Sequence, residues 1–113
     1  MQSLKYRNQK VEIDGHTFDS KAEGRRYLSL KLLERGNRIE GLELQPSYPL
    51  YSRTGAKIGK YVGDFKYTEL GDSGQPLGVV CEDVKGMPTP VYRWKIKHAK
   101  ADYPSIEFRE IKA

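Results

Sequence analysis

The sequence predicts a single α/β domain in which a mixed central sheet is flanked by two helices. With 113 residues, the chain is long enough for one modest core but too short for two independent ones. Several segments alternate apolar and polar residues as half-buried strands do, and two others repeat apolar residues at helical spacing. Packing helices against a sheet buries both kinds of apolar face, which favours this layered architecture.

A hairpin and a helix are expected first. Apolar and polar residues alternate on both sides of Asp14-Gly15, a dipeptide that readily adopts the positive φ angles of a tight hairpin turn. Ser20 then fits a helix N-cap, and Glu23 stands three residues later, as in a capping box. Gly36 is expected to end this helix.

The middle of the chain predicts three strands. Residues 39–51 have an extended pattern, and their two prolines restrict it to edge or bulged positions. Residues 57–70 are rich in β-branched and aromatic residues and predict one continuous strand. The GDSGQP segment that follows is typical of a hairpin loop. Residues 77–85 should therefore pair antiparallel with the preceding strand.

A second helix and a last strand complete the predicted fold. In VYRWKIKHAKADY, Val91, Trp94, His98 and Ala101 recur at helical spacing, and Pro104 should stop the helix. The closing SIEFREIK alternates apolar and charged residues, as a strand does.

The chain is basic, with 20 lysines and arginines against 15 acidic residues and a formal net charge of +5. This balance suits a polyanionic partner such as DNA, and it is equally consistent with a role in solubility alone. Residues 1–10 are polar and basic, and we expect a flexible arm there, ahead of a domain over residues 11–113.

Composition also excludes several classes of protein. The single Cys81 rules out an internal disulfide and a zinc site with several cysteines. No apolar run approaches the roughly 18 residues of a membrane span, and the first residues lack the apolar core of a signal peptide. We therefore expect a cytoplasmic protein with no membrane partner.

Three polar residues interrupt the apolar strands and suggest a metal site. Asp83 and Lys85 share one face of a strand, and pairing with the neighbouring strand can bring Asp64 to Asp83. Two close carboxylates repel each other unless a cation lies between them, and Mg²⁺ prefers oxygen ligands. We expect Mg²⁺ or Mn²⁺ at Asp64, Asp83 and the Val84 carbonyl. Lys85 would then assist phosphodiester hydrolysis by orienting water or stabilising charge.

A structural alternative remains for this pattern, because an ion pair between Asp83 and Lys85 at a strand end is common and contributes little energy. Glu82 should face the opposite side of the strand and pair with a surface lysine. A β-bulge would exchange its role with that of Asp83.

The acid followed by D-x-K resembles the PD-(D/E)xK nuclease superfamily, whose restriction-endonuclease-like fold has an αβββαβ core. The blocks FDSKAEGRRY, LELQP, VGDF, EDVKG and YPSIEFREI, which span nearly the whole chain, are similar to small phage- and prophage-encoded nucleases of that superfamily. This resemblance implies an endonuclease that cuts DNA, with branched DNA as a substrate, in the bacterial host cytoplasm. Two positions depart from the pattern: Gly63 replaces the superfamily's proline, and Gly24 lowers helix propensity.

The resemblance also implies two further site residues. Glu23 holds the position of the helix carboxylate that often completes the metal site, although its capping-box role would explain it equally well. Gln45 resembles a recurring glutamine of related phage nucleases, and would touch the scissile phosphate or the attacking water. The alternative for Gln45 is a polar edge residue at a bulge.

Basic residues on the two helices are expected to contact phosphates without reading sequence. The alternative for about half of these residues is a solvated position without any partner. His16 and His98 are too isolated to suggest zinc, and Trp94 is expected to pack in the protein rather than stack on a base. The nucleic-acid contacts expected are Arg25, Arg26, Arg93, Lys95 and Lys97.

Two alternative functions involve binding without catalysis. The first is a nuclease fold that binds DNA or a protein without cutting, and the second is a basic interaction protein with no enzymatic role. The intact set of Asp64, Asp83 and Lys85 argues against both. The sequence leaves open whether the protein is a monomer or a homodimer.

Overall fold

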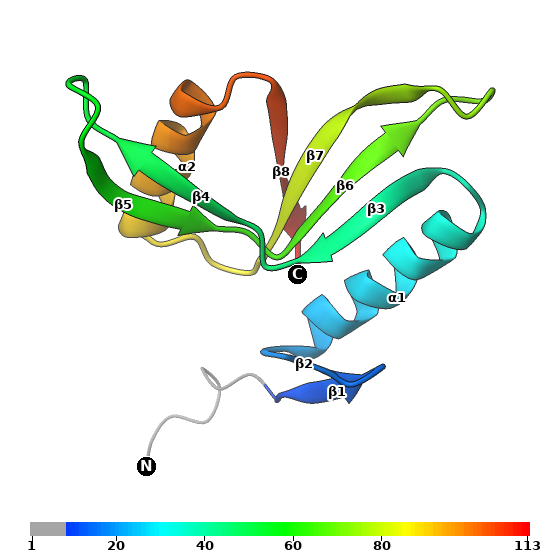
Figure 1. The fold of residues 1–113 in the computed structure, drawn as a ribbon. Coiled ribbons are helices and arrows are strands. Elements are labelled where there is room, and N and C mark those ends of the chain that lie inside the picture. The colour runs from blue at the N-terminus through cyan, green and yellow to red at the C-terminus, as the bar shows by residue number, and fades with distance from the viewer. Residues whose placement is uncertain (1–8) are drawn as a thin grey trace, which may run out of the picture.

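The computed structural model describes residues 9–113 and has the expected mixed α/β composition, with two helices and a mixed sheet (Figure 1). Residues 1–8 of the expected basic arm lie outside the described residues. The elements are β1 (Val11–Ile13), β2 (His16–Phe18), α1 (Lys21–Arg35), β3 (Ile39–Leu44), β4 (Ser47–Tyr51), β5 (Lys57–Val62), β6 (Phe65–Leu70), β7 (Pro76–Lys85), α2 (Pro90–Asp102) and β8 (Ile106–Lys112). In the described part of the chain, neither helix is both long and apolar enough to cross a membrane.

The main sheet has four strands in the order β3-β6-β7-β8. Strands β3, β6 and β7 are antiparallel, and β8 joins β7 in parallel after the crossover through α2. Two hairpins, β1–β2 and β4–β5, form separate two-stranded sheets. Figure 1 shows α1 beside β3, whereas α2 lies beside the β4–β5 hairpin, and the two groups meet at a narrow junction.

Alternation along β7 separates the two hydrophobic cores. Val80 and Val84 belong to the core on the α1 side, and Cys81 between them belongs to the core on the α2 side. The buried residues of the first core are Phe18, Tyr27, Leu30, Ile39, Phe65, Tyr67 and Val80. Those of the second are Tyr48, Leu50, Tyr61, Cys81 and Ala99.

Helix α1 begins and ends where the sequence predicts, with Ser20 as its N-cap and Gly36 as its C-cap. The Ser20 hydroxyl accepts a hydrogen bond from the Glu23 backbone N–H at 3.1 Å, which confirms the N-cap. At the C-terminal end, the residue after this cap, Asn37, has a positive φ of 60°. The Arg38 N–H then donates to the Leu33 carbonyl at 2.9 Å, as in a Schellman motif.

The N-terminal hairpin is confirmed, and it explains an unfavourable glycine in α1. Asp14 and Gly15 have φ values of 53° and 80° and form the two-residue turn between β1 and β2. The hairpin packs against α1 at Gly24, where an added Cβ would lie 2.7 Å from Val11 Cγ2. Gly24 therefore lowers helix propensity but allows the hairpin to approach the helix.

The prediction of one continuous strand over residues 57–70 is wrong. The strand is interrupted at Gly63-Asp64, so that β5 and β6 lie in different sheets. A second interruption, at Gln45-Pro46, separates β3 from β4, and Gln45 has a positive φ of 53° there. The β4–β5 hairpin is thus an insertion that leaves the main sheet and returns to it at Asp64. Pro49 lies in β4, which has a single partner strand, and Pro46 lies outside any strand.

Candidate functional site

The two interruptions between strands, at Gln45-Pro46 and at Gly63-Asp64, lie side by side. Backbone hydrogen bonds join them to each other and to β7. The Gln45 N–H donates to the Asp64 carbonyl, and the Asp64 N–H donates to the Glu82 carbonyl, each at 2.9 Å. The Gly63 N–H donates to the Pro46 carbonyl at 2.9 Å. Asp64 is therefore fixed beside the end of β7, as the sequence predicts, at the point where the two groups of elements meet.

Two acidic side chains at this junction are held by specific donors. One carboxylate oxygen of Asp64 accepts a hydrogen bond of 2.7 Å from the Val84 N–H. Asp83, whose side chain is 6% exposed, accepts one of 2.6 Å from the Tyr61 hydroxyl. Because each acid has a fixed donor, their positions are set before any ligand arrives.

The electrostatics of the junction disfavour three neighbouring negative charges. Burial raises the pKa of Asp64 to about 7, and the carboxylates of Asp83 and Glu23 contribute, against the opposing effect of the Val84 N–H. Burial likewise raises the pKa of Glu23, helped by the charges of Asp19 and Asp83. A divalent cation among these acids would relieve this repulsion.

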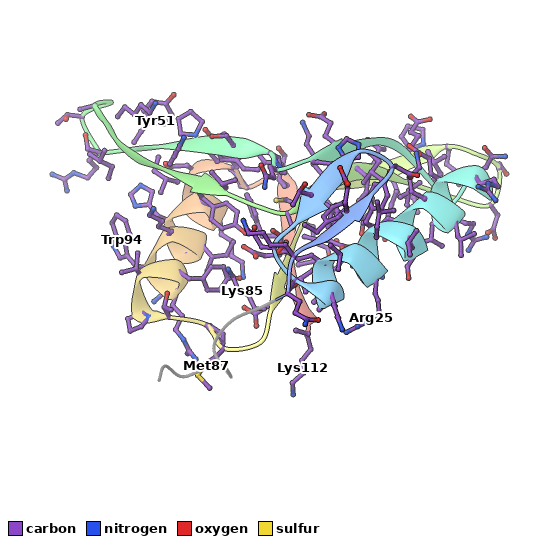
Figure 2. All side chains as sticks on the ribbon, turned by 90° about the horizontal axis from the view of Figure 1, so that it is seen from below. Arg25, Tyr51, Lys85, Met87, Trp94 and Lys112 are labelled. Carbon is purple, nitrogen blue, oxygen red and sulfur yellow. The ribbon has the colours of Figure 1, made fainter. Side chains whose placement is uncertain are left out.

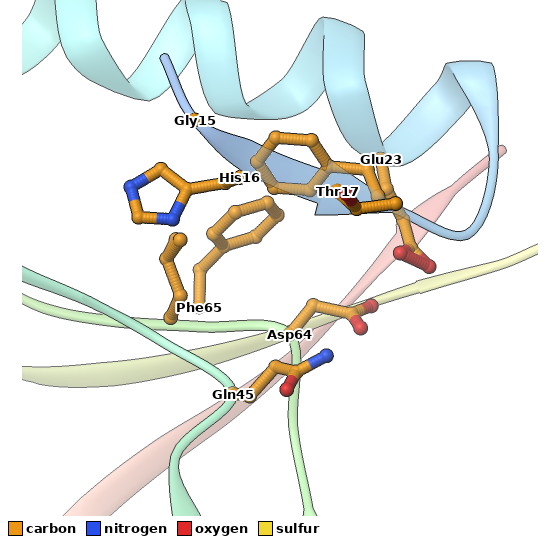
Figure 3. A pocket seen from close by; sticks show the side chains of 9 residues that line it. Gly15, His16, Thr17, Glu23, Gln45, Asp64 and Phe65 are labelled. Atoms are coloured by element: carbon orange, nitrogen blue, oxygen red, sulfur yellow. The ribbon is translucent and has the colours of Figure 1, made fainter. Parts of the chain in front are cut away.

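Glu23, Gln45 and Asp64 line one cavity of about 260 Å³, which β2 and the start of β6 also border. Figure 3 shows the Glu23 and Asp64 carboxylates directed into the same space, with the Gln45 amide next to Asp64. In α1 it is the Ser20 hydroxyl that makes the cap, through the Glu23 backbone N–H. The Glu23 side chain thus reaches the site while its backbone serves the cap.

Lys85 lies on the α2 side of the same junction, as its alternation with Asp83 predicts. Its Nζ is 3.3 Å from an Asp83 oxygen and 4.6 Å from the centre of the Tyr92 ring. The Tyr92 hydroxyl donates to Glu110 at 3.0 Å, which fixes that ring. The side chain of Lys85 is 32% exposed, so its amine is positioned by two partners and still reaches solvent.

Glu82 faces away from Asp83, as expected, but the prediction of a surface lysine as its partner is wrong. The Glu82 side chain is fully buried on the α1 side, where Arg26 donates two hydrogen bonds of 2.8 and 2.6 Å. Tyr67 donates a third through its hydroxyl. The pairing of β7 with β8 is regular through this stretch, so no bulge exchanges Glu82 with Asp83.

The basic residues expected to contact phosphate occupy two different helices. On α1, Arg26 is committed to Glu82, which explains this residue without a nucleic acid, and Arg25 is exposed beside it (Figure 2). On α2, Arg93 and Lys97 are exposed and Lys95 is partly buried.

Sequence reasoning missed the tyrosines that support the site. Tyr61 holds Asp83, and Tyr92 lies under Lys85 with its hydroxyl on Glu110. Both occupy positions that suit an ordinary core aromatic, and only the fold shows that their hydroxyls or ring faces meet the charged residues. No spacing in the sequence distinguishes them from the other tyrosines.

Close packing between β5 and β6 requires a glycine at position 63. A Cβ at this position would lie 2.5 Å from the Cys81 sulfur and 3.3 Å from the Glu82 carbonyl oxygen. A proline at position 63 would also remove the backbone N–H that donates to the Pro46 carbonyl. Packing and hydrogen bonding thus explain why glycine, and not proline, fits at position 63.

We expect Gly63→Ala to lower the free energy of unfolding by about 1–3 kcal/mol, because the new methyl group overpacks the contact with Cys81. Urea unfolding of Gly63→Ala, Cys81→Ala and the double variant measures the coupling between the two sites. The cost of Gly63→Ala should be smaller when Cys81 is already alanine. Wild-type stability of the single Gly63→Ala variant would contradict this account of the break.

The donors at the junction fit a hard divalent cation bound with open positions. Within residues 9–113, no group of three or more histidine, cysteine, aspartate and glutamate side chains is arranged as a ready cage for a metal ion. Mg²⁺ needs no such cage, because it is commonly held by one or two carboxylates and keeps waters and substrate phosphate as its other ligands. The ligands of Mg²⁺ would be Asp64, Asp83 and the Val84 carbonyl, and Glu23 would lie next to them.

The raised pKa of Asp64 predicts a pH dependence of stability. The unfolded chain loses the Asp64 proton near pH 4, and the folded protein holds it up to about pH 7, so rising pH across this window favours unfolding. In chelator, we expect Asp64→Asn to gain stability relative to the wild type between pH 5 and pH 8. Thermal unfolding at both pH values measures the change, with Asp72→Asn, 97% exposed, as control. A difference that does not change with pH would contradict the burial of this charge.

Comparison with known proteins places the chain in one family. A family model described as "Protein of unknown function (DUF1064)" matches residues 3–113. No curated protein and no solved structure matched the chain.

Proposed function

We propose that this chain, which belongs to the DUF1064 family, is a metal-dependent endonuclease that hydrolyses phosphodiester bonds in DNA. The observation that carries the proposal is the convergence of Asp64, Asp83 and Lys85 at one junction. Each of the three is held by a named partner: the Val84 N–H, the Tyr61 hydroxyl and the Tyr92 ring. Such preorganisation is what catalysis of phosphate hydrolysis needs.

The order of elements supports a restriction-endonuclease-like core. Setting aside the β1–β2 hairpin and the inserted β4–β5 hairpin, the chain runs α1, β3, β6, β7, α2, β8. This is the helix, three strands, helix, strand order that the resemblance implies. The three strands are antiparallel and the last is parallel to β7, so the site lies where β6 begins and β7 ends.

The chemistry divides among the residues of the junction. When bound at Asp64 and Asp83, Mg²⁺ or Mn²⁺ would supply Lewis acidity and a nucleophilic water. Lys85, with its amine partly exposed, would orient that water or stabilise the charge that develops on the phosphate. Glu23 and Gln45 line the adjacent cavity, where they would contact the water or the phosphate.

A panel of end-labelled substrates tests the proposal: single-stranded DNA, duplex DNA, a four-way junction and single-stranded RNA, each with Mg²⁺, Mn²⁺ or chelator. We expect DNA cleavage with either metal and none in chelator. The junction substrate examines the preference for branched DNA, which the nuclease resemblance alone suggests. Binding without cleavage of any substrate would overturn the proposal and favour a non-catalytic binding module.

A further inference from the structure

Charge is distributed unevenly between the two groups of elements that Figure 1 shows. We define the α2 wing as residues 46–62 and 86–105, which comprise β4, β5, α2 and their connections. The wing contains 7 lysines and arginines and a single acidic residue, Asp102, whereas the rest of the described chain has 11 basic and 14 acidic residues. The basic residues of the wing are Arg53, Lys57, Lys60, Arg93, Lys95, Lys97 and Lys100.

The cations of the α2 wing have no counter-charge within the described part of the chain. None of the seven forms an ion pair, and all but the half-buried Lys95 are exposed. Asp102 is engaged with His98 at 3.3 Å and with the Tyr51 N–H at 2.9 Å. Outside the wing, by contrast, most basic residues are paired with carboxylates. The wing therefore presents positive charge to an external partner.

An exposed aromatic residue accompanies this charge. Trp94 is 52% exposed, which contradicts the expectation that it packs in the core. Its ring contacts that of His98, with 5.6 Å between centroids, and Figure 2 shows it directed away from Lys85 and the body of the protein. Val91, also exposed, lies one turn before it.

Helical spacing places the aromatic and basic residues next to one another on α2. Val91, Trp94 and His98 form one stripe along the helix, and Arg93, Lys97 and Lys100 form the adjacent stripe. Alternating cations and aromatic rings are the usual means of holding single-stranded nucleic acid, in which phosphates meet the cations and unpaired bases stack on the rings. In a duplex, by contrast, the base faces are already stacked on one another.

We propose that the α2 wing binds a single-stranded segment of the DNA substrate, with its phosphates on the wing's cations and one base stacked on Trp94. This inference rests on the proposed nuclease function and names its substrate class: DNA with an unpaired strand beside the scissile bond. The wing is continuous with the site, because Tyr92, which lies under Lys85, belongs to the same helix as Trp94.

Trp94 is the sole tryptophan of the chain, so its fluorescence reports directly on the proposed contact. We would titrate the full chain in chelator, without cleavage, with a single-stranded oligothymidine and with a duplex of equal phosphate number. The single strand should quench the fluorescence in a saturable, salt-sensitive manner, and the duplex should not. Equal quenching by both, or quenching by neither, would overturn the proposal.

Variants test the stacking and charge contributions separately, with anisotropy of a labelled oligothymidine as the readout. Trp94→Leu should weaken single-strand binding about tenfold, and Trp94→Phe should restore much of the loss. Lys97→Ala should reduce the slope of affinity against salt by about one phosphate contact. Arg35→Ala, which removes one exposed charge from α1, is the matched control and should leave the affinity nearly unchanged.

The remaining outcomes separate this inference from the proposed function. Cleavage of DNA with wild-type affinity in Trp94→Leu would refute the single-strand site and leave the nuclease intact. Trp94-dependent binding with no cleavage in any metal would retain the site and refute the nuclease. Self-association that shields Trp94 in the absence of DNA would instead identify the wing as an interface between copies and overturn the inference.

Discussion

Asp83→Asn is expected to reduce the rate of DNA cleavage by about a thousandfold or more, the loss that several kcal/mol of metal-derived transition-state stabilisation would give. Asparagine keeps the size of the side chain and can still accept the Tyr61 hydrogen bond, but it lacks the charge that would hold the cation. Single-turnover cleavage with enzyme in excess measures the chemical step.

The matched control for this variant is Asp72→Asn, which removes the same charge from an exposed loop outside the junction. It should cleave at the wild-type rate. Asp83→Asn should also unfold cooperatively, so that lost activity reports on the site. Comparable cleavage by Asp83→Asn and the wild type would show that this carboxylate is not part of the catalytic centre.

Arg26→Met is expected to lower the free energy of unfolding by about 3–5 kcal/mol, because it leaves the buried Glu82 charge without its cation. Glu82 has no exposed surface, and the two Arg26 hydrogen bonds are its strongest compensation. Urea denaturation measures the loss.

The double variant Arg26→Met with Glu82→Gln provides the control. Glutamine removes the charge and can still accept from the Tyr67 hydroxyl, so the double variant should recover a large part of the stability. A loss below about 1 kcal/mol for Arg26→Met alone, the range of an exposed ion pair, would contradict the buried ion pair between Arg26 and Glu82.

Local signals in the sequence predicted most of the elements. The Asp14-Gly15 turn, the Ser20 cap and the period-two alternation of β7 act within a few residues, and each appears in the structure as expected. The break at Gly63-Asp64 could not be predicted in this way, because residues 57–70 have strand-like composition throughout. The contacts made at this point are with residues distant in sequence: the Gly63 N–H donates to the Pro46 carbonyl, and the Cys81 sulfur lies close to Gly63.

The candidate site was predictable in its charged residues and not in their supports. Strand alternation placed Asp83 and Lys85 on one face and Glu82 on the other, which the structure bears out. The partner of Glu82 comes from α1, 56 residues earlier in the chain, and no pattern in the sequence links the two positions. The exposure of Trp94 likewise depends on which face of α2 the second core uses.

The most direct test of the central claim compares the wild type with Lys85→Met in DNA cleavage and in Mn²⁺ binding by calorimetry, on the same preparations. Lysine is not among the metal's proposed ligands, so the account predicts that Lys85→Met binds Mn²⁺ as the wild type does but cleaves DNA at least about a hundredfold more slowly. Equal cleavage by the two proteins would contradict the claim that this junction is a nuclease active centre.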